Sequence, residues 1–300
     1  MWKKLLDFFI ALLNNTLSNI LAVFSFIFII IAFLKVEYVD NKFKVLLMQI
    51  PNMPLLIIGI ALLIIAIIIH LVEFKRIKIK GLLKKIDKGF KVIIGNSQLN
   101  IVFSDIKDIH CSDSQSAIVL PTNDSFDDEC INDPTSSLGA FFQEHFKNGI
   151  KKIQDLIIKE LEGVPYEKIG DINIYPLNTV VYLNGPLGSN QRVILVNITT
   201  KRKREGIQSD PSYIAKGILE VFKLSADEKL TKLYMPVLGA GHGGVDFNVA
   251  LHALLLEVIY NFKYKKFHNV KELNIIIYDP EKKLIKEVKN TVYCVIDTIL

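Results

Sequence analysis

The stretch that decides the fold of most of the chain is Leu233-Tyr-Met-Pro-Val-Leu238, followed directly by Gly239-Ala-Gly-His-Gly-Gly244. The first six residues are typical of a buried strand, and a helical pattern begins at Phe247. Four glycines in six positions let the backbone turn tightly and bring its N–H groups close to a ligand. Because a helix N-terminus adds partial positive charge, this segment is suited to binding a phosphate or pyrophosphate.

A second strand end carries polar residues, in Ala117-Ile-Val-Leu-Pro-Thr-Asn123. An asparagine there can bond a sugar hydroxyl, although a turn-capping role is the alternative. The glycine loop also matches the dinucleotide fingerprint G-x-G-x-x-G, which requires an acidic residue about 20 positions later. The next acid at a strand end, Asp279, lies too far along, so this interpretation is the weaker one. No Lys-Ser/Thr follows the loop, which excludes a P-loop.

From Gly81 onward, short apolar runs alternate with helical patterns. This alternation predicts a three-layer α/β/α domain with a mixed or parallel sheet, in which ligands bind beyond the carboxyl ends of the strands. The expected strands are 90–94, 100–103, 117–120, 179–183, 192–198, 233–238 and 273–278. The expected helices are 136–161 with a break near Asn148-Gly149, 212–222, 247–262 and 280–289.

The N-terminal region is much more apolar than the rest. Half of all residues are hydrophobic, and the excess lies before residue 75. Residues 8–34 carry no charge, and residues 53–72 contain thirteen Leu and Ile. We therefore expect two transmembrane helices at about 10–34 and 53–72, within a membrane region 1–80, and a ligand-binding domain over 81–300.

Charge and cysteine content bear on location. The net charge of +5 is concentrated in a basic cluster, which predicts that both termini and the domain lie on the cytoplasmic side and does not favour nucleic-acid binding. The cluster comprises Lys75, Arg76, Lys78, Lys80, Lys84 and Lys85. Cys111, Cys130 and Cys294 form no C-x-x-C pair, so a reducing compartment is expected.

Small and polar residues recur along one face of the first apolar run. Such a face lets helices approach closely, either against the second run through Gly59 and Ala66 or in self-association. The residues of this face are Ala11, Asn15, Ser18, Ala22 and Ser25.

The two strand ends together resemble the macro-domain family, which binds ADP-ribose. The Asn123 strand resembles the family's Ile-Val-Asn-Ala-Asn strand, 104–106 resembles Gly-Asp-Ile, and 236–244 resembles the Pro-x-Leu-Gly-x-Gly phosphate loop. The resemblance covers roughly residues 88 to 290 and implies an ADP-ribose derivative as ligand, with no cofactor and no metal. The ligand-binding residues it implies are Asp105, Ile106, Asn123, Leu238, Gly239, Ala240, Gly241, His242, Gly243 and Gly244.

One segment departs from the family. Where many macro domains have a run of glycines, this chain has Ser125-Phe-Asp-Asp-Glu-Cys130. This difference favours a sensor without catalytic residues. Asp127 and Asp128 are expected to attract a cationic group at the far end of the ligand, unless they belong to a solvated acidic loop.

Two transmembrane helices before such a domain resemble the membrane effectors of type II Thoeris antiphage defence. The resemblance implies a multi-pass protein of the bacterial cell membrane and a homo-oligomer. It also implies that a TIR-domain enzyme makes the ADP-ribose-derived signal from NAD, and that the helices then assemble and disrupt the membrane. The alternatives are a membrane-tethered ADP-ribosyl hydrolase and a non-catalytic adaptor for ADP-ribosylated partners.

Overall fold

The computed structural model describes residues 17–32, 34–39, 42–47, 52–111, 113–202, 206–264 and 269–299. The chain divides into two compact units, Met1–Lys80 and Gly81–Leu300.

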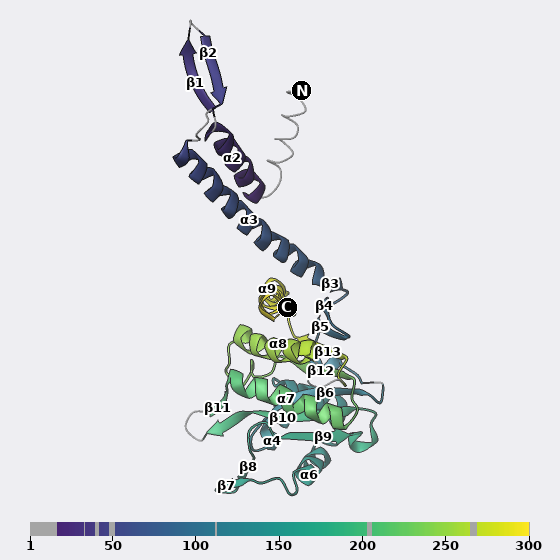
Figure 1. The fold of residues 1–300 in the computed structure, drawn as a ribbon. Helices are drawn as coiled ribbons and strands as arrows, with labels where there is room; N and C mark the ends of the chain where they lie inside the picture. The colour runs from purple at the N-terminus through teal and green to yellow at the C-terminus, as the bar shows by residue number, and fades with distance from the viewer. Residues whose placement is uncertain are drawn as a thin grey trace. The chain divides into compact units, whose positions relative to one another are not determined.

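The first unit contains two helices joined by a hairpin (Figure 1). Helix α2 spans Leu17–Ala32 and α3 begins at Met53 and ends at Leu82. Between them, β1 (Leu34–Val39) pairs antiparallel with β2 (Lys42–Leu47), a hairpin that the sequence analysis did not predict.

The two helices approach each other closely at one glycine. The buried Ser25 hydroxyl donates to the Gly59 carbonyl at 2.8 Å. A Cβ on Gly59 would lie 2.7 Å from Ile29 Cγ1, so a larger residue would force the helices apart. Of the other residues on the predicted face, Ala22 is half-buried, the side chain of Ser18 is not described, and Ala11 and Asn15 lie outside the described residues.

The prediction of membrane-spanning helices is wrong. Within the described part of the chain, no helix is long and apolar enough to cross a membrane. Helix α2 has 16 residues, about 24 Å, which is shorter than the ~30 Å hydrocarbon core. Helix α3 continues into Glu73, Lys75 and Arg76, so its apolar run is only one part of a longer, charged helix. The predicted helices at about 10–34 and 53–72 and the multi-pass location in the bacterial cell membrane are corrected accordingly.

The second unit is built on a nine-stranded sheet, two strands more than the seven expected, and the sheet is mixed, as predicted. The strand order is β11-β10-β6-β12-β13-β5-β4-β3, and β9 also pairs with β10. The central strands β10, β6, β12, β13 and β5 are parallel, and the outer pairings are antiparallel. The strands are β3 (Leu83–Ile86), β4 (Gly89–Ile94), β5 (Ser97–Phe103), β6 (Ser116–Asn123), β9 (Val180–Asn184), β10 (Arg192–Arg202), β11 (Gly206–Ser209), β12 (Lys232–Pro236) and β13 (Glu272–Ile277).

Helices cover both faces of this sheet, because alternate side chains of a strand point to opposite sides. On β10, Val193 and Leu195 belong to the cluster packed beneath α5 (Ser137–Phe146) and α6 (Ile150–Glu160). Val196 and Ile198, further along β10 on the opposite face, contact Gly217 of α7. Figure 1 shows α7 (Pro211–Asp227) beside α8 (Phe247–Tyr264), and α9 (Ile285–Ile299) packs on α8.

Several boundaries differ from prediction for local reasons. The last helix begins at Ile285 instead of Pro280, because the Asp279 carboxylate accepts from the N–H groups of Lys283 and Leu284 and holds that segment in a turn. The short strand β3 is not among the expected strands, because two of its four residues are exposed lysines and the apolar pattern is correspondingly weak. Two small additional elements, the hairpin of β7 (Glu167–Ile169) and β8 (Ile172–Ile174) and the helix α4 (Asp128–Asn132), were also missed.

Candidate functional site

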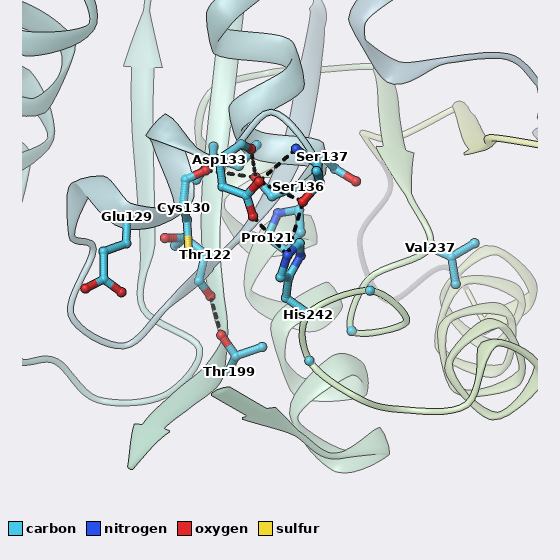
Figure 2. Close-up of a pocket in the computed structure, with 15 residues that line it drawn as sticks. Pro121, Thr122, Glu129, Cys130, Asp133, Ser136, Ser137, Thr199, Val237 and His242 are labelled. Carbon is cyan, nitrogen blue, oxygen red and sulfur yellow. Dashed lines mark hydrogen bonds and ion pairs between the residues drawn. The ribbon is translucent and has the colours of Figure 1, made fainter. Parts of the chain in front are cut away.

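Two adjoining cavities lie at the carboxyl ends of the central strands. One, of about 220 Å³, is bordered by Thr122 and Thr199 at the ends of β6 and β10 (Figure 2). The other, of about 540 Å³, is bordered by Asp105 after β5. Ser136 and Gly241 line both, so together the cavities form one elongated groove. Its position is where an open α/β sheet binds ligands.

The glycine loop forms the side of the groove and presents free backbone donors. Its turns are closed by the N–H of Gly244, which donates to the Gly241 carbonyl at 3.0 Å, and that of Val245, which donates to Gly239 at 3.2 Å. Gly239 and Gly244 adopt φ values of 80° and 70°, which glycine tolerates best. The N–H groups of residues 240–243 donate to no residue that the structure describes. Consecutive unpaired N–H groups of this kind make an anion-binding concavity.

The helix after the loop contributes less than the sequence indicated. The Asp246 carboxylate accepts from the N–H groups of Asn248 and Val249 at 2.9 and 3.2 Å, and so caps the start of α8. Because these N–H groups are already occupied, the loop offers more of the donors than the N-terminus of α8 does.

Two glycines of the loop differ in the space around them. A Cβ on Gly241 would meet no atom within 4 Å, whereas one on Gly243 would lie 2.8 Å from the Gly239 carbonyl oxygen and 2.9 Å from Ser209 Cβ. The N–H of Ser209 also donates to the Gly243 carbonyl at 2.8 Å, which ties the loop to β11. Gly243 is therefore required by the fold, while Gly241 leaves open space in the groove.

A contact between His242 and Asp133 joins the glycine loop to the segment between α4 and α5. Figure 2 shows the His242 ring directed toward Asp133, and Nε2 lies 2.9 Å from Asp133 Oδ2. The other carboxylate oxygen accepts from the N–H and hydroxyl of Thr135 at 2.8 and 2.7 Å. The Thr135 hydroxyl is the main reason that the pKa of Asp133 is below its ordinary value. Asp133 is thus held ionised with a fixed orientation.

The acidic loop after β6 is directed largely inward. The fully buried Asn123 donates to Asp127 at 3.0 Å and accepts from Ser125, and Lys201 donates to Asp127 at 3.0 Å. Burial alone would raise the pKa of Asp127, but the hydrogen bonds from Ser125, Asn123 and Lys201 outweigh it and hold the pKa below its ordinary value. Asp127 also caps α4 by accepting from the Glu129 N–H.

Neither Asn123 nor Asp127 borders the cavities, and the side chain of Asp128 is not described. The acid of this loop that borders the groove is Glu129, and Lys201 pairs with it at 2.6 Å. A preference of Asp127 for a cationic ligand group therefore has no support in this geometry.

A bulky residue stands in the segment where the family pattern has glycines. Phe126 adopts φ 49° and is buried, with its ring 5.7 Å from that of Tyr175. In the same segment, burial raises the pKa of the Cys130 thiol to about 11, and the negative charge of Asp127 adds to this increase. The thiol borders the cavity but stays protonated at neutral pH.

At the opposite end of the groove, Asp105 caps the short helix η1 (Ile106–Asp108) by accepting from the Lys107 N–H at 3.2 Å. The Lys107 ammonium lies 3.3 Å from the same carboxylate, and the exposed Tyr278 borders the same cavity. Ile106 borders this cavity too, whereas Leu238 is a fully buried core residue. The structure therefore brings Asp105, Ile106 and residues 239–243 to one groove.

Sequence reasoning missed most of the groove's other wall. One usable signal was Asp133-Pro-Thr-Ser136, a capping sequence ahead of a predicted helix, in which Ser136 caps α5. The missed side chains are Thr122, Asp133, Thr135, Ser136, Ser137 and Thr199.

The mixed sheet, the helices on both faces and a groove beside a glycine loop define a domain of the macro class. The Oceanobacillus iheyensis macrodomain with ADP shares the fold, at 17% identity and a TM-score of 0.52, covering 70% of this chain and 97% of that one. The same organism's macrodomain with MES bound gives 16% identity and the same coverage and TM-score. At such identity the likeness concerns the fold alone. No curated protein matches the chain in sequence.

The family model described as "Thoeris protein ThsA, Macro domain" matches residues 99–278. This is more than half of the chain, and the chain belongs to that family. These comparisons confirm the predicted macro-domain fold and the predicted relation to Thoeris proteins.

Proposed function

We propose that the protein is a non-catalytic sensor of an ADP-ribose-type ligand in Thoeris defence. The observation that carries this proposal is the row of four N–H groups at 240–243, which donate to no described residue and belong to residues that line an elongated groove. Such a row binds a diphosphate through its oxygens. Asp105 at one end of the groove supplies an acceptor for an adenine amino group. The hydroxyls of Thr122 and Thr199 at the other end suit a ribose.

The hydrogen bonding and protonation of the groups near the smaller cavity favour binding of the ligand without its hydrolysis. Hydrolysis would need a base able to take a proton from water. Asp127 is engaged by Asn123, Ser125 and Lys201, and Glu129 is paired with the same lysine. The Cys130 thiol is neutral at physiological pH because burial raises its pKa.

Membership of the Thoeris family supports a place for this sensor in a pathway. A TIR-domain enzyme that consumes NAD would supply the ADP-ribose-derived signal, acting through the molecule and not necessarily by contact. Self-association of the chain is the response that we propose.

The test uses the full chain and three measurements. Calorimetry should show binding of ADP-ribose and weaker binding of adenosine, which lacks the diphosphate. Incubation with an ADP-ribosylated protein should release no ADP-ribose, and light scattering should show a larger assembly when the ligand from the TIR-domain enzyme is added. Absence of ADP-ribose binding would refute the sensor, and multiple turnovers would identify a hydrolase instead.

A further inference from the structure

Among the described residues, the charged side chains that border the groove carry more acid than base. They are Asp105, Lys107, Glu129, Asp133 and His242. Lys107 is engaged by Asp105, and Lys201 reaches Glu129 from outside the cavities. An anionic diphosphate entering this groove therefore needs a further positive charge close to the glycine loop.

His242 is the side chain placed to supply that charge. It belongs to the loop that presents the free N–H groups, and its ring borders the cavity. Asp133 lies 2.9 Å from Nε2 and, being ionised, can only accept, so Nε2 carries a proton. No described residue bonds the second ring nitrogen, Nδ1. The neutral ring therefore presents a lone pair at Nδ1, and only the cation presents a second N–H donor.

We propose that His242 is a ligand-positioning residue that binds the diphosphate only in its protonated form, with Asp133 holding the ring in place. The protein thereby binds its ligand more tightly at lower pH. This inference rests on the proposed function, since it assigns a role within the same site.

The sign of the effect follows from the groups involved. Histidine is the side chain whose charge changes between about pH 5 and 8, and the cation is the form favoured at the lower end of that range. Asp133 remains ionised over this range, since its pKa is lowered. The thiol of Cys130, in the same cavity, stays neutral. Each phosphate of ADP-ribose carries one ester and one anhydride bond and therefore has no second ionisation, so the ligand's own charge does not change between pH 5.5 and 8.5.

The experiment is calorimetric titration of the full chain with ADP-ribose and with adenosine at several values between pH 5.5 and 8.5. For the wild type, ADP-ribose affinity should fall about tenfold across the series, the effect of losing one charge-assisted hydrogen bond. Adenosine affinity should not change, because adenosine has no phosphate. His242→Gln keeps an N–H for Asp133 but cannot titrate, and should bind ADP-ribose at every pH as the wild type does at pH 8.5.

Two further variants separate this role from a structural one. Asp133→Asn removes the charge that holds the imidazolium in place, and should reduce the gain in affinity at the lower end of the pH series. His252→Gln on α8, outside both cavities, should keep the wild-type pH dependence. A pH-independent affinity in the wild type, or an unchanged pH dependence in His242→Gln, would overturn the inference while leaving the sensor intact. A wild type that binds no ADP-ribose at any pH would overturn the proposed function itself.

Discussion

Replacing Gly241 by Asp should abolish binding of ADP-ribose without unfolding the domain. Gly241 borders both cavities, and a Cβ there meets no atom within 4 Å. Its φ lies outside the left-handed region, so a side chain introduces no backbone strain. A carboxylate about 4 Å from a phosphate charge costs about 4 kcal/mol at an effective dielectric constant of about 20. That energy corresponds to a loss of about three decades in affinity.

The assay is calorimetry with ADP-ribose, accompanied by thermal unfolding of each variant. Gly241→Asn has nearly the same shape without the charge, and should lose much less affinity than Gly241→Asp. Gly243→Ala is the structural control: its Cβ would lie 2.8 Å from the Gly239 carbonyl oxygen, so this variant should lower Tm. Undiminished affinity in Gly241→Asp would place the ligand elsewhere. Equal losses in the Asn and Asp variants would mean that space, and not charge, governs the site.

Four other predictions concern the loop after β6 and the adenine end. Asp127→Ala should lower the free energy of unfolding by about 2 kcal/mol, because it leaves buried donors unpaired. Glu129 is exposed, so Glu129→Ala should lower it by less than about 1 kcal/mol. Urea titration of both variants measures the two changes. The pKa of Asp127 is lowered in the folded protein, so its ionised form stabilises the fold above the ordinary carboxyl pKa of about 4, and this stability is lost as the pH falls below it. Asp127→Asn should therefore lose less stability in acid than the wild type does. ADP-ribose should protect Cys130 from alkylation at pH 9 but not the exposed Cys294, and equal protection of both would contradict the assigned cavity. Asp105→Ala should weaken ADP-ribose binding about tenfold while leaving ribose 5-phosphate unaffected, measured by calorimetry.

The part of the site that sequence could predict is the part built from local pattern. The apolar run before Asn123 fixed β6, and the four glycines after β12 indicated a turn with free backbone donors. In both places the residue types themselves require the observed backbone. The alternation of strands and helices likewise predicted a mixed sheet.

What sequence could not predict depends on tertiary partners. Asp127 lies in an acidic segment, yet its carboxylate is paired with Lys201, which lies 74 positions away in the sequence. The pairing of His242 with Asp133 likewise joins two loops that are distant in sequence. In the N-terminal unit, apolar composition indicated two helices but not where the second one ends, since α3 continues from the expected end at 72 to Leu82, and the β-hairpin after α2 was not predicted.

The tie between Ser209 and the glycine loop makes that loop a natural reporter of occupancy. In the free protein the Ser209 N–H is hydrogen-bonded to Gly243, whereas those of residues 240–243 have no acceptor among the described residues. Deuterium should therefore replace hydrogen slowly at Ser209 and quickly at the four loop amides. Once a diphosphate accepts from them, these amides should exchange far more slowly, while Ser209 keeps its rate. The ratio of the exchange rates at residues 240–243 and at Ser209 would therefore report ligand binding without a label on the ligand.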